Sequence, residues 1–487
     1  MTSSAAAPDE PDPRRWRALW VCLAVGFITL LDVSIVNVAL PSIDEALGAS
    51  SSQLQLVVAG YTLAFGLALV PAGRYGDARG RRTVMLVGLV LFALTSLGSG
   101  LAPTGGVLAG MRLLQGLSAG MLNPQVTGFI QELFRGPERA RAFGTFGATV
   151  GVSLAIGPLL GGAIIQAAGT ESGWRWVFFV NVPVIALVLP FAWRWLPRAA
   201  HPRGTAHFDH VGLLLIALTT VALMLPLVTT TGVGDDPARW WWLLVAAVLG
   251  TATVLWERRF QRRTGAAVLD PDVLGQPSFR NGALLGLAYF AGFTSVFLVI
   301  TLYLQTVLHF TALQAGLVST PFAVASAVSS KLAGRLVVAR GRRLVVVGLV
   351  LVLVGLAGTY VVVRQLDAPG VGWAVAATQL VTGAGSGLVI APNQTLTLER
   401  VPVGSAGVAG SMLQLGQRVG SALGVAVNVA VFYATLAAGG SGALAVDRAL
   451  RVTSALVLAA LVVALVDLRT RSAQASPKAG RAGSATA

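Results

Sequence analysis

One carboxylate stands inside an otherwise apolar stretch of this sequence. Asp32 lies within residues 18–41, and it is the only acid that we place deep within an apolar segment. A carboxylate in hydrocarbon is costly, so such residues usually face a water-filled cavity and serve proton or ion pathways. Burial also favours the neutral form of the group, which allows it to take up a proton. We therefore predict that Asp32 takes up protons from outside and releases them inside. The alternative is a structural hydrogen bond between helices.

Arg112, in the apolar segment 105–131, is the natural partner of Asp32. At a rise of about 1.5 Å per residue, the two residues lie about 13 Å and 10 Å from the outer ends of their helices, which is a similar depth. A nearby guanidinium favours the charged carboxylate and would help it to release a proton. Gln115 lies one turn further along the same helix face. A purely structural ion pair is the alternative reading of this arrangement.

The elements that position these side chains are apolar segments of membrane-spanning length. The chain is 55% hydrophobic and only 11% charged, whereas an ordinary soluble domain is about one quarter charged. A helix needs roughly 20 apolar residues to cross a hydrocarbon core of about 30 Å. We expect fourteen transmembrane helices in an all-α polytopic membrane protein, near residues 18–41, 53–72, 83–101, 105–131, 141–166, 177–196, 211–229, 240–258, 281–308, 312–335, 344–363, 372–397, 405–434 and 449–467.

The distribution of basic residues predicts the topology. With both termini in the cytosol, 27 of the 35 Lys and Arg residues fall on the cytoplasmic side. Five fall outside and three lie within spans, and this asymmetry follows the positive-inside rule. The net charge of +15 is thereby explained by topology, so we expect no nucleic-acid partner.

Several other functions are disfavoured by the residue types present. The single Cys22 excludes a disulfide framework, and the four histidines are too scattered to suggest a metal centre. No nucleophile–base constellation is visible, so neither an enzyme nor a cofactor is expected. No soluble signalling domain is present either, which disfavours a membrane sensor or scaffold. The first span lacks a cleavage site, and we expect it to remain in the mature protein. The preference for Arg over Lys suggests a high-GC bacterium.

The chain contains an internal repeat. Residues 73–82, GRYGDARGRR, match residues 334–343, GRLVVARGRR, at seven of ten positions. A weaker pair, GMRLLQGLSAG at 110–120 and ATQLVTGAGSG at 377–387, has nearly the same offset. Such parallel repeats predict two six-helix bundles with two helices inserted between them. The expected parts are a cytoplasmic N-tail (1–17), an N-terminal bundle (18–200), a linker with helices 7 and 8 (201–280), a C-terminal bundle (281–470) and a disordered cytoplasmic C-tail (471–487).

Two further motifs have glycines at informative spacing. In the first repeat loop, glycines permit a tight turn, and Asp77 can dock on the positive end of a helix or pair with an arginine. In the second copy, Val338 replaces this acid. In the fifth span, Gly157 and Gly161 are spaced four apart and permit close helix contact, and Pro158 predicts a bend.

Taken together, these motifs resemble the fourteen-helix drug:proton antiporters of the major facilitator superfamily. LDVSIVNVALP (31–41) is similar to that family's helix-1 signature, and Arg112, Gln115 and Gly116 match its helix-4 motif. GVSLAIGPLLGG (151–162) matches the antiporter motif, and WRWVFFVNVPV (174–184) is typical at the start of helix 6. The resemblance implies a proton-driven exporter of amphipathic drugs or antibiotics in the bacterial inner membrane, expected to be monomeric. The alternatives are export of a native metabolite or lipid, or uptake.

The resemblance also assigns roles to individual residues. The proton-coupling pair is Asp32 and Arg112. The conformational latch, which holds the cytoplasmic face in the outward-open state, is Gly73, Asp77, Gly80, Arg81 and Arg82. The antiporter-helix residues are Gly151, Gly157, Pro158, Gly161 and Gly162. The candidate substrate-cavity residues, for which ordinary helix packing is the alternative, are Asn37, Gln115, Tyr61, Tyr289, Phe293, Gln379, Asn393 and Gln414.

Overall fold

The computed structural model describes residues 15–198, 209–230, 236–264, 271–365 and 370–475, and within these ranges every regular element is helical. The predicted tails at 1–17 and 471–487 lie mostly outside the described residues. The long helices are α1 (Arg15–Leu47), α3 (Tyr61–Arg79), α4 (Arg81–Gly100), α5 (Gly105–Leu133), α6 (Gly136–Ala168), α7 (Thr170–Phe179), α8 (Asn181–Trp195), α9 (His210–Val228), α10 (Trp241–Thr264), α12 (Pro277–Leu302), α13 (Ala312–Arg340), α14 (Arg342–Gln365), α15 (Val371–Thr397), α16 (Ala406–Ala437) and α17 (Gly442–Ala475). The short elements are α2 (Ser51–Gln55), η1 (Leu56–Gly60), η2 (Pro237–Trp240), α11 (Pro271–Gly275), η3 (Tyr303–Val307) and η4 (Val403–Ser405).

The predicted membrane spans correspond to helices of the structure. Thirteen helical segments of the described chain are long and apolar enough to cross a membrane. The remaining predicted span, 105–131, is α5, which has 29 residues and is therefore also long enough. This helix carries polar side chains such as Asn123, Gln125 and Gln131, which are buried inside the protein. The all-helical membrane fold expected from the sequence is confirmed.

The chain divides into two compact units that do not follow the chain in a simple way. Unit 1 comprises residues 1–142, 156–208 and 402–411, and unit 2 comprises residues 143–155, 209–401 and 412–487. The helices α6 and α16 therefore contribute segments to both units. The domain boundaries expected from the sequence remain a prediction.

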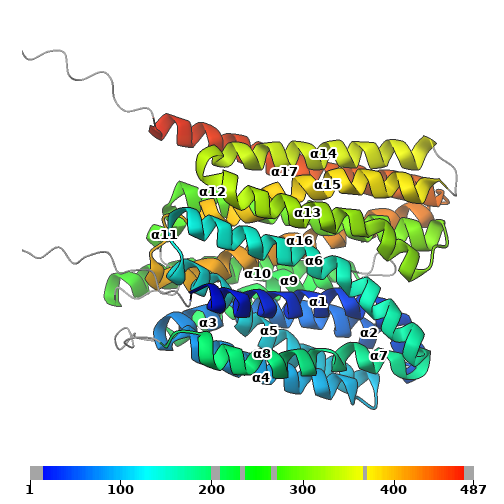
Figure 1. Cartoon of the computed structure of the whole chain (residues 1–487), viewed down its shortest axis with the longest axis horizontal. Coiled ribbons are helices and arrows are strands. Elements are labelled where there is room, and N and C mark those ends of the chain that lie inside the picture. The colour runs from blue at the N-terminus through cyan, green and yellow to red at the C-terminus, as the bar shows by residue number, and fades with distance from the viewer. Residues whose placement is uncertain (1–14, 199–208, 231–235, 265–270, 366–369, 476–487) are drawn as a thin grey trace, which may run out of the picture. The chain divides into compact units, whose positions relative to one another are not determined.

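In unit 1, the helices that carry the candidate site pack as neighbours. The helix α5 lies against α1, α3 and α4, and α8 lies against α1 and α4 (Figure 1). The turn between α3 and α4 is Gly80, whose φ of 106° is disfavoured for residues with a Cβ. A two-helix turn this short places the ends of α3 and α4 side by side.

Two glycines of α5 allow α3 to approach closely. A Cβ on Gly116 would collide with the carbonyl oxygen of Tyr61, and a Cβ on Gly120 would collide with that of Phe65. In lipid, helix association depends on such close packing, because lipid tails are as apolar as the side chains themselves. The α3–α5 contact is therefore fixed by backbone-to-backbone proximity.

Unit 2 repeats this packing. A Cβ on Gly383 of α15 would collide with the carbonyl oxygen of Phe322 of α13, and a Cβ on Gly387 would collide with that of Ser326. The glycines of the two units are 267 residues apart and the facing carbonyls 261 residues apart, as in the sequence repeat. The repeat thus extends from motifs to helix packing.

The helices α9 and α10 form a pair within unit 2. Thr219 and Thr253 join them through a 3.1 Å hydrogen bond, and the Trp256 indole donates to Asp209, just before α9. Leu227 of α9 packs on Ala422 and Ala426 of α16. The inserted pair is therefore attached to unit 2 by apolar packing.

Candidate functional site

The centre of unit 1 is a buried ion pair between α1 and α5. Asp32 is 0% exposed and Arg112 is 2% exposed. Arg112 Nη1 lies 2.6 Å from Asp32 Oδ2. Both charges are removed from solvent, so each needs the other together with further hydrogen bonds. The structure thus brings together the two residues that the depth argument paired.

Polar side chains from three more positions complete the network around Asp32. Gln115 Nε2 donates to Asp32 Oδ1 at 2.9 Å and to the Ser96 hydroxyl oxygen at 2.6 Å. Asn181, at the start of α8, donates to the same Oδ1 at 2.8 Å and to Ser96 at 3.3 Å. The Asp32 carboxylate therefore accepts three hydrogen bonds, from Arg112, Gln115 and Asn181.

Sequence reasoning missed two members of this network. Asn181 lies in the quoted segment 174–184, where its polar side chain in an apolar helix was the available signal. Ser96 gave no signal, because serine is common in membrane helices and often bonds its own helix backbone.

The guanidinium of Arg112 is held on several sides. Its Nε donates to the Val57 carbonyl at 3.1 Å, and its Nη1 also donates to Gln115 Oε1 at 2.7 Å. The guanidinium carbon lies 4.2 Å from the Tyr61 ring centroid and 5.7 Å from that of Phe178, distances typical of cation–π contacts. Val57 belongs to the π-type turn η1, an irregularity frequent at functional sites.

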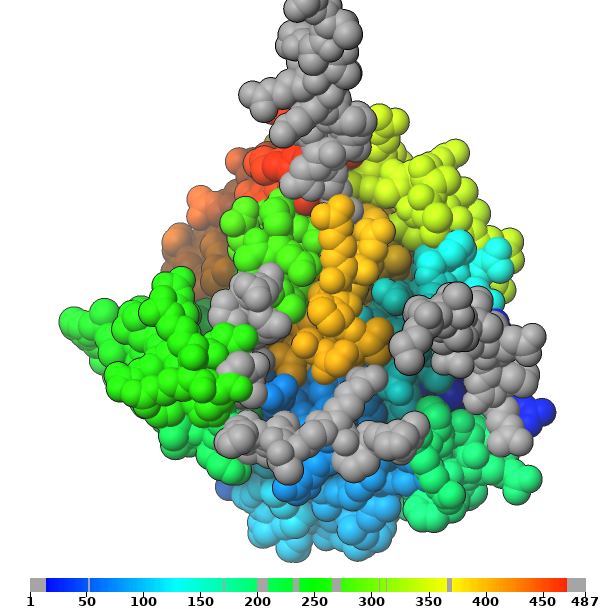
Figure 2. All heavy atoms as spheres, turned by 90° about the vertical axis from the view of Figure 1, so that its left-hand side faces the viewer, coloured from blue at the N-terminus to red at the C-terminus, as the bar shows by residue number. Residues whose placement is uncertain are grey.

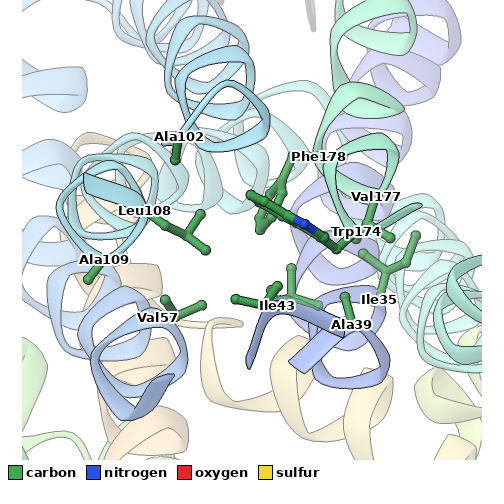
Figure 3. Close-up of a cluster of buried hydrophobic side chains, with 11 residues drawn as sticks. Ile35, Ala39, Ile43, Val57, Ala102, Leu108, Ala109, Trp174, Val177 and Phe178 are labelled. Carbon is green, nitrogen blue, oxygen red and sulfur yellow. The ribbon is translucent and has the colours of Figure 1, made fainter. Parts of the chain in front are cut away.

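An apolar cluster packs beside this network (Figure 3). Its members are contributed by α1, η1, α5, α7 and the turn between α4 and α5. Trp174 and Phe178 of α7 are fully buried in it and stack edge to face, with centroids 6.3 Å apart. Two of its members, Val57 and Phe178, contact Arg112 directly, so the guanidinium lies in apolar surroundings, in which electrostatic interactions are stronger than in water.

The antiporter-helix glycines pack against two different helices, α1 and α13. A Cβ on Gly157 or Gly161 of α6 would meet Ser34 or Ile35 of α1, two to three residues from Asp32. Gly151 instead faces Ala323 and Ser326 of α13. Close packing therefore brings α6 onto the helix face next to the proton-site candidate.

The other two antiporter-helix residues are Gly162 and Pro158. Gly162 has open space where a Cβ would lie. Pro158 stands inside the continuous helix α6 and cannot donate to the backbone ladder. The bend expected there remains a prediction.

Asp77, at the end of α3, docks on the start of α16 and also pairs with an arginine. Its oxygens accept the backbone N–H groups of Gly407 at 3.1 Å and Val408 at 3.0 Å. Arg81 Nη2 donates to Asp77 Oδ1 at 2.6 Å. The first N–H groups of a helix lack intrahelical acceptors and carry partial positive charge, so a carboxylate suits them.

Two further latch candidates, Arg81 and Gly73, lie at this contact. Arg81 also pairs with Glu132 of α5 and donates to the Val403 carbonyl at 3.1 Å. Gly73 lies against the backbone of Gly407, where a Cβ would collide. All of these residues belong to unit 1.

Arg82, the last latch candidate, contacts α8 and not Asp77. Its Nη2 donates to the Trp193 carbonyl of α8 at 2.5 Å, and its guanidinium carbon lies 4.6 Å from the Trp193 ring centroid. The structure therefore does not bring Arg82 into the Asp77 contact.

The second copy of the loop carries a different network. Val338, the counterpart of Asp77, is 58% exposed. Arg342 is buried and donates to Asp467 of α17 at 2.6 Å and to Asn393 of α15 at 2.5 Å. Asn281 of α12 also donates to Asp467, at 3.0 Å. The Arg342 charge is thus neutralised inside unit 2.

Other acids of the described chain are buried as well, although they lie near helix ends and not deep within a span. Asp467 and Asp447 of α17 are buried, as are Glu257 of α10 and Asp209. The helix α17 begins at Gly442, before the predicted start of the last span, so Asp447 lies inside it. Acids near helix ends look solvent-accessible in sequence and become buried only through tertiary neighbours.

The candidate substrate residues of unit 2 include an aromatic cluster. Tyr289 and Phe293 of α12 have centroids 5.6 Å apart. Phe322 of α13 lies 5.9 Å from Phe293 and 4.7 Å from Phe297. Tyr289, Phe293 and Phe322 are buried, so in this structure the aromatic rings pack against one another.

The polar candidates for the substrate cavity differ in burial and in hydrogen bonding. Gln379 is 0% exposed, and neither its amide nitrogen nor its oxygen has a hydrogen-bond partner in the described structure. Asn393 is occupied by Arg342 and the Gly282 carbonyl. Gln414 is buried in α16, whereas Asn37 of α1 is exposed. Of these, only Gln379 is a buried amide with unused hydrogen-bonding groups.

Helices of spanning length around a buried charged network define this chain as a multi-pass helical membrane transporter. The chain belongs to the Major Facilitator Superfamily, whose family model matches residues 22–425. It is 35% identical to the puromycin resistance protein pur8 of Streptomyces alboniger, over 96% of this chain and 95% of that protein. It is 32% identical to the probable actinorhodin transporter of Streptomyces coelicolor, over 88% of this chain and 75% of that protein.

A solved structure shares the fold. The human organic anion transporter MFSD10 matches with a TM-score of 0.68 at 15% identity, covering 93% of this chain and 100% of that one. At this identity the likeness concerns the fold alone.

Proposed function

We propose that this protein exports amphipathic organic molecules, including antibiotics, in exchange for protons. The observation that carries the proposal is the network around Asp32. A carboxylate buried in a membrane helix, held by one guanidinium and two amides, can gain or lose one proton without losing all its partners. The named relatives are resistance and transport proteins for antibiotics, which supports export.

Proton exchange at Asp32 proceeds through the partners already in place. In the ionised state the carboxylate accepts bonds from Arg112, Gln115 and Asn181. Protonation removes the charge and weakens the attraction to Arg112, which frees the guanidinium to turn toward other acceptors. Such a change at the contact between α1 and α5 would couple the proton to helix movement and thereby to alternating access.

The aromatic cluster at Tyr289, Phe293 and Phe322, which is buried in this structure, is proposed to contact the substrate once the helices around it move apart during transport. Gln379, with both amide groups unused, is the proposed polar contact for a substrate. A buried amide without partners costs free energy, so occupation by a ligand with a donor or acceptor would be favourable. Apolar lining with a few polar groups suits an amphipathic molecule.

The test is uphill export by energised everted vesicles, with ethidium or puromycin as the probe. Transport that stops on addition of an uncoupler, and that is lost in Asp32→Asn, would support the proposal. The matched control is Asp467→Asn, because Asp467 is equally buried and also lies 2.6 Å from a guanidinium. Uphill transport by Asp32→Asn under a pH gradient would show that Asp32 is structural. Failure with every probe in a well-expressed wild type would instead favour a narrow native metabolite.

A further inference from the structure

A groove in unit 1 lies apart from the Asp32 network. It has a volume of about 1410 Å³ and is formed by the start of α1, the first half of α4 and the end of α8. Its walls are apolar, with side chains such as Leu86 and Val90 of α4 facing Leu189 and Pro190 of α8. Figure 2 views the end of the molecule at which α4 begins and α8 ends.

Four arginines lie at one end of this groove. Arg15 begins α1, Arg82 is the second residue of α4, Arg194 is in the last turn of α8, and Arg198 follows that helix. Among the described residues that line the groove there is no carboxylate. Arg82 and Arg198 are close enough for their charges to oppose one another. Like charges gathered in this way favour the binding of an anion.

The arginines also have unused hydrogen-bond donors. Arg15 donates through Nη2 to Glu138 at 2.8 Å, while its buried Nε and Nη1 have no acceptor within the described structure. The buried Nε of Arg82 likewise has no acceptor there. Buried N–H groups without partners are costly, and an oxygen-rich ligand would satisfy them.

We propose that this groove binds an anionic phospholipid. Phosphate oxygens match the fork of donors that a guanidinium presents. The acyl chains would lie along the apolar walls between α4 and α8, where Val90 and Leu91 are exposed. Trp193, 63% exposed beside Arg82, suits the headgroup level at which tryptophan is enriched.

The composition of the groove favours a lipid over a water-soluble anion. A free phosphate would use the arginines but leave the apolar walls uncovered, whereas a diacyl phospholipid meets both. Basic pockets between membrane helices on the cytoplasmic side attract anionic headgroups. Under the positive-inside topology this end of the helices lies on that side.

The experiment is native mass spectrometry of the purified full-length protein titrated with phosphatidylglycerol. Phosphatidylcholine with the same acyl chains is the lipid control. The double variant Arg194→Gln/Arg198→Gln should weaken phosphatidylglycerol binding by roughly thirtyfold, because each basic residue near an anionic lipid contributes about fivefold. The matched control is Arg262→Gln/Arg263→Gln, which removes two exposed charges from α10, away from the groove.

Three results would overturn the proposal. The first is equal loss of binding in the two double variants, which would indicate a general effect of charge. The second is equal binding of phosphatidylglycerol and phosphatidylcholine. The third is competition by glycerol phosphate at the same concentration as the lipid, which would identify a soluble-anion site. Thermal unfolding in detergent confirms that each variant is folded before the titration.

Discussion

Asn181 and Asp32, 149 residues apart in the chain, are joined by a 2.8 Å hydrogen bond from the amide of the first to the carboxylate of the second. The bond connects the start of α8 to the middle of α1. It makes Asn181 a positioning residue for the proposed proton site, because its uncharged amide holds the Asp32 carboxylate in place.

Asn181→Leu should lower the initial rate of uphill efflux, because it removes one of the three hydrogen-bond donors to the buried Asp32 carboxylate. Asn181→Gln keeps an amide and should retain more of the rate. The measurement is the initial rate of efflux from vesicles at equal expression. Equal losses in the two variants would contradict a positioning role for the amide.

Removing one member of the buried ion pair should destabilise the protein more than removing both charges. Arg112→Gln leaves Asp32 buried without its counter-ion, at a cost of about 3–5 kcal/mol. Asp32→Asn/Arg112→Gln should recover much of that loss and still fail to transport uphill. Thermal unfolding in detergent measures the first effect and vesicle transport the second. If the double variant is as unstable as Arg112→Gln, the pair is not the dominant interaction of either residue.

The Asp77 contact should be specific to the first copy of the loop. Asp77→Asn removes a charge from the start of α16 and from the pair with Arg81, a helix-terminus interaction of about 0.3–2 kcal/mol. We expect a lower initial rate of transport at equal expression. Val338→Asn, at the repeat-related position, introduces the same residue on an exposed surface and should change the rate little. Equal effects of the two changes would contradict a latch at Asp77.

Alanine at the repeat-related glycines should weaken both units to a similar degree. In Gly116→Ala and Gly383→Ala, the new methyl group collides with a carbonyl oxygen of the facing helix. Overpacking of this kind costs about 1–3 kcal/mol. The measurement is the midpoint of thermal unfolding in detergent, with Gly110→Ala as the control, because nothing lies within 4 Å of a Cβ there. Alanine has the higher helix propensity, so Gly110→Ala should leave the midpoint unchanged or raise it, and a midpoint as low as the others would contradict collision as the cause.

The fold could be predicted from sequence because the membrane constrains it strongly. Backbone groups in hydrocarbon must be paired within helices, so length and apolar content are sufficient to locate the spans. The pairing of Asp32 with Arg112 was also accessible, since a buried charge needs a partner at its own depth. The helix α5 is the instructive case, because its buried polar side chains lower its hydropathy without changing its place in the fold.

The rest of the site depends on tertiary contacts that residue types do not reveal. Asp467 stands at the last residue of a predicted span and resembles a solvent-facing helix end, yet it is buried against Arg342. Asn181 and Ser96 are uncharged and short, so their presence in a helix does not require a partner. Only the packing of α4, α5 and α8 onto α1 shows that they converge on one carboxylate.

Gln379 occupies the position that Arg112 holds in the other unit, since both stand four residues before the glycine that contacts the facing helix. The two units therefore share the glycines that let two helices meet, while the residue one turn before the first of these glycines is a charged guanidinium in one unit and an uncharged amide in the other. The same helix crossing thus accommodates a buried ion pair in unit 1 and an amide without a hydrogen-bond partner among the described residues in unit 2.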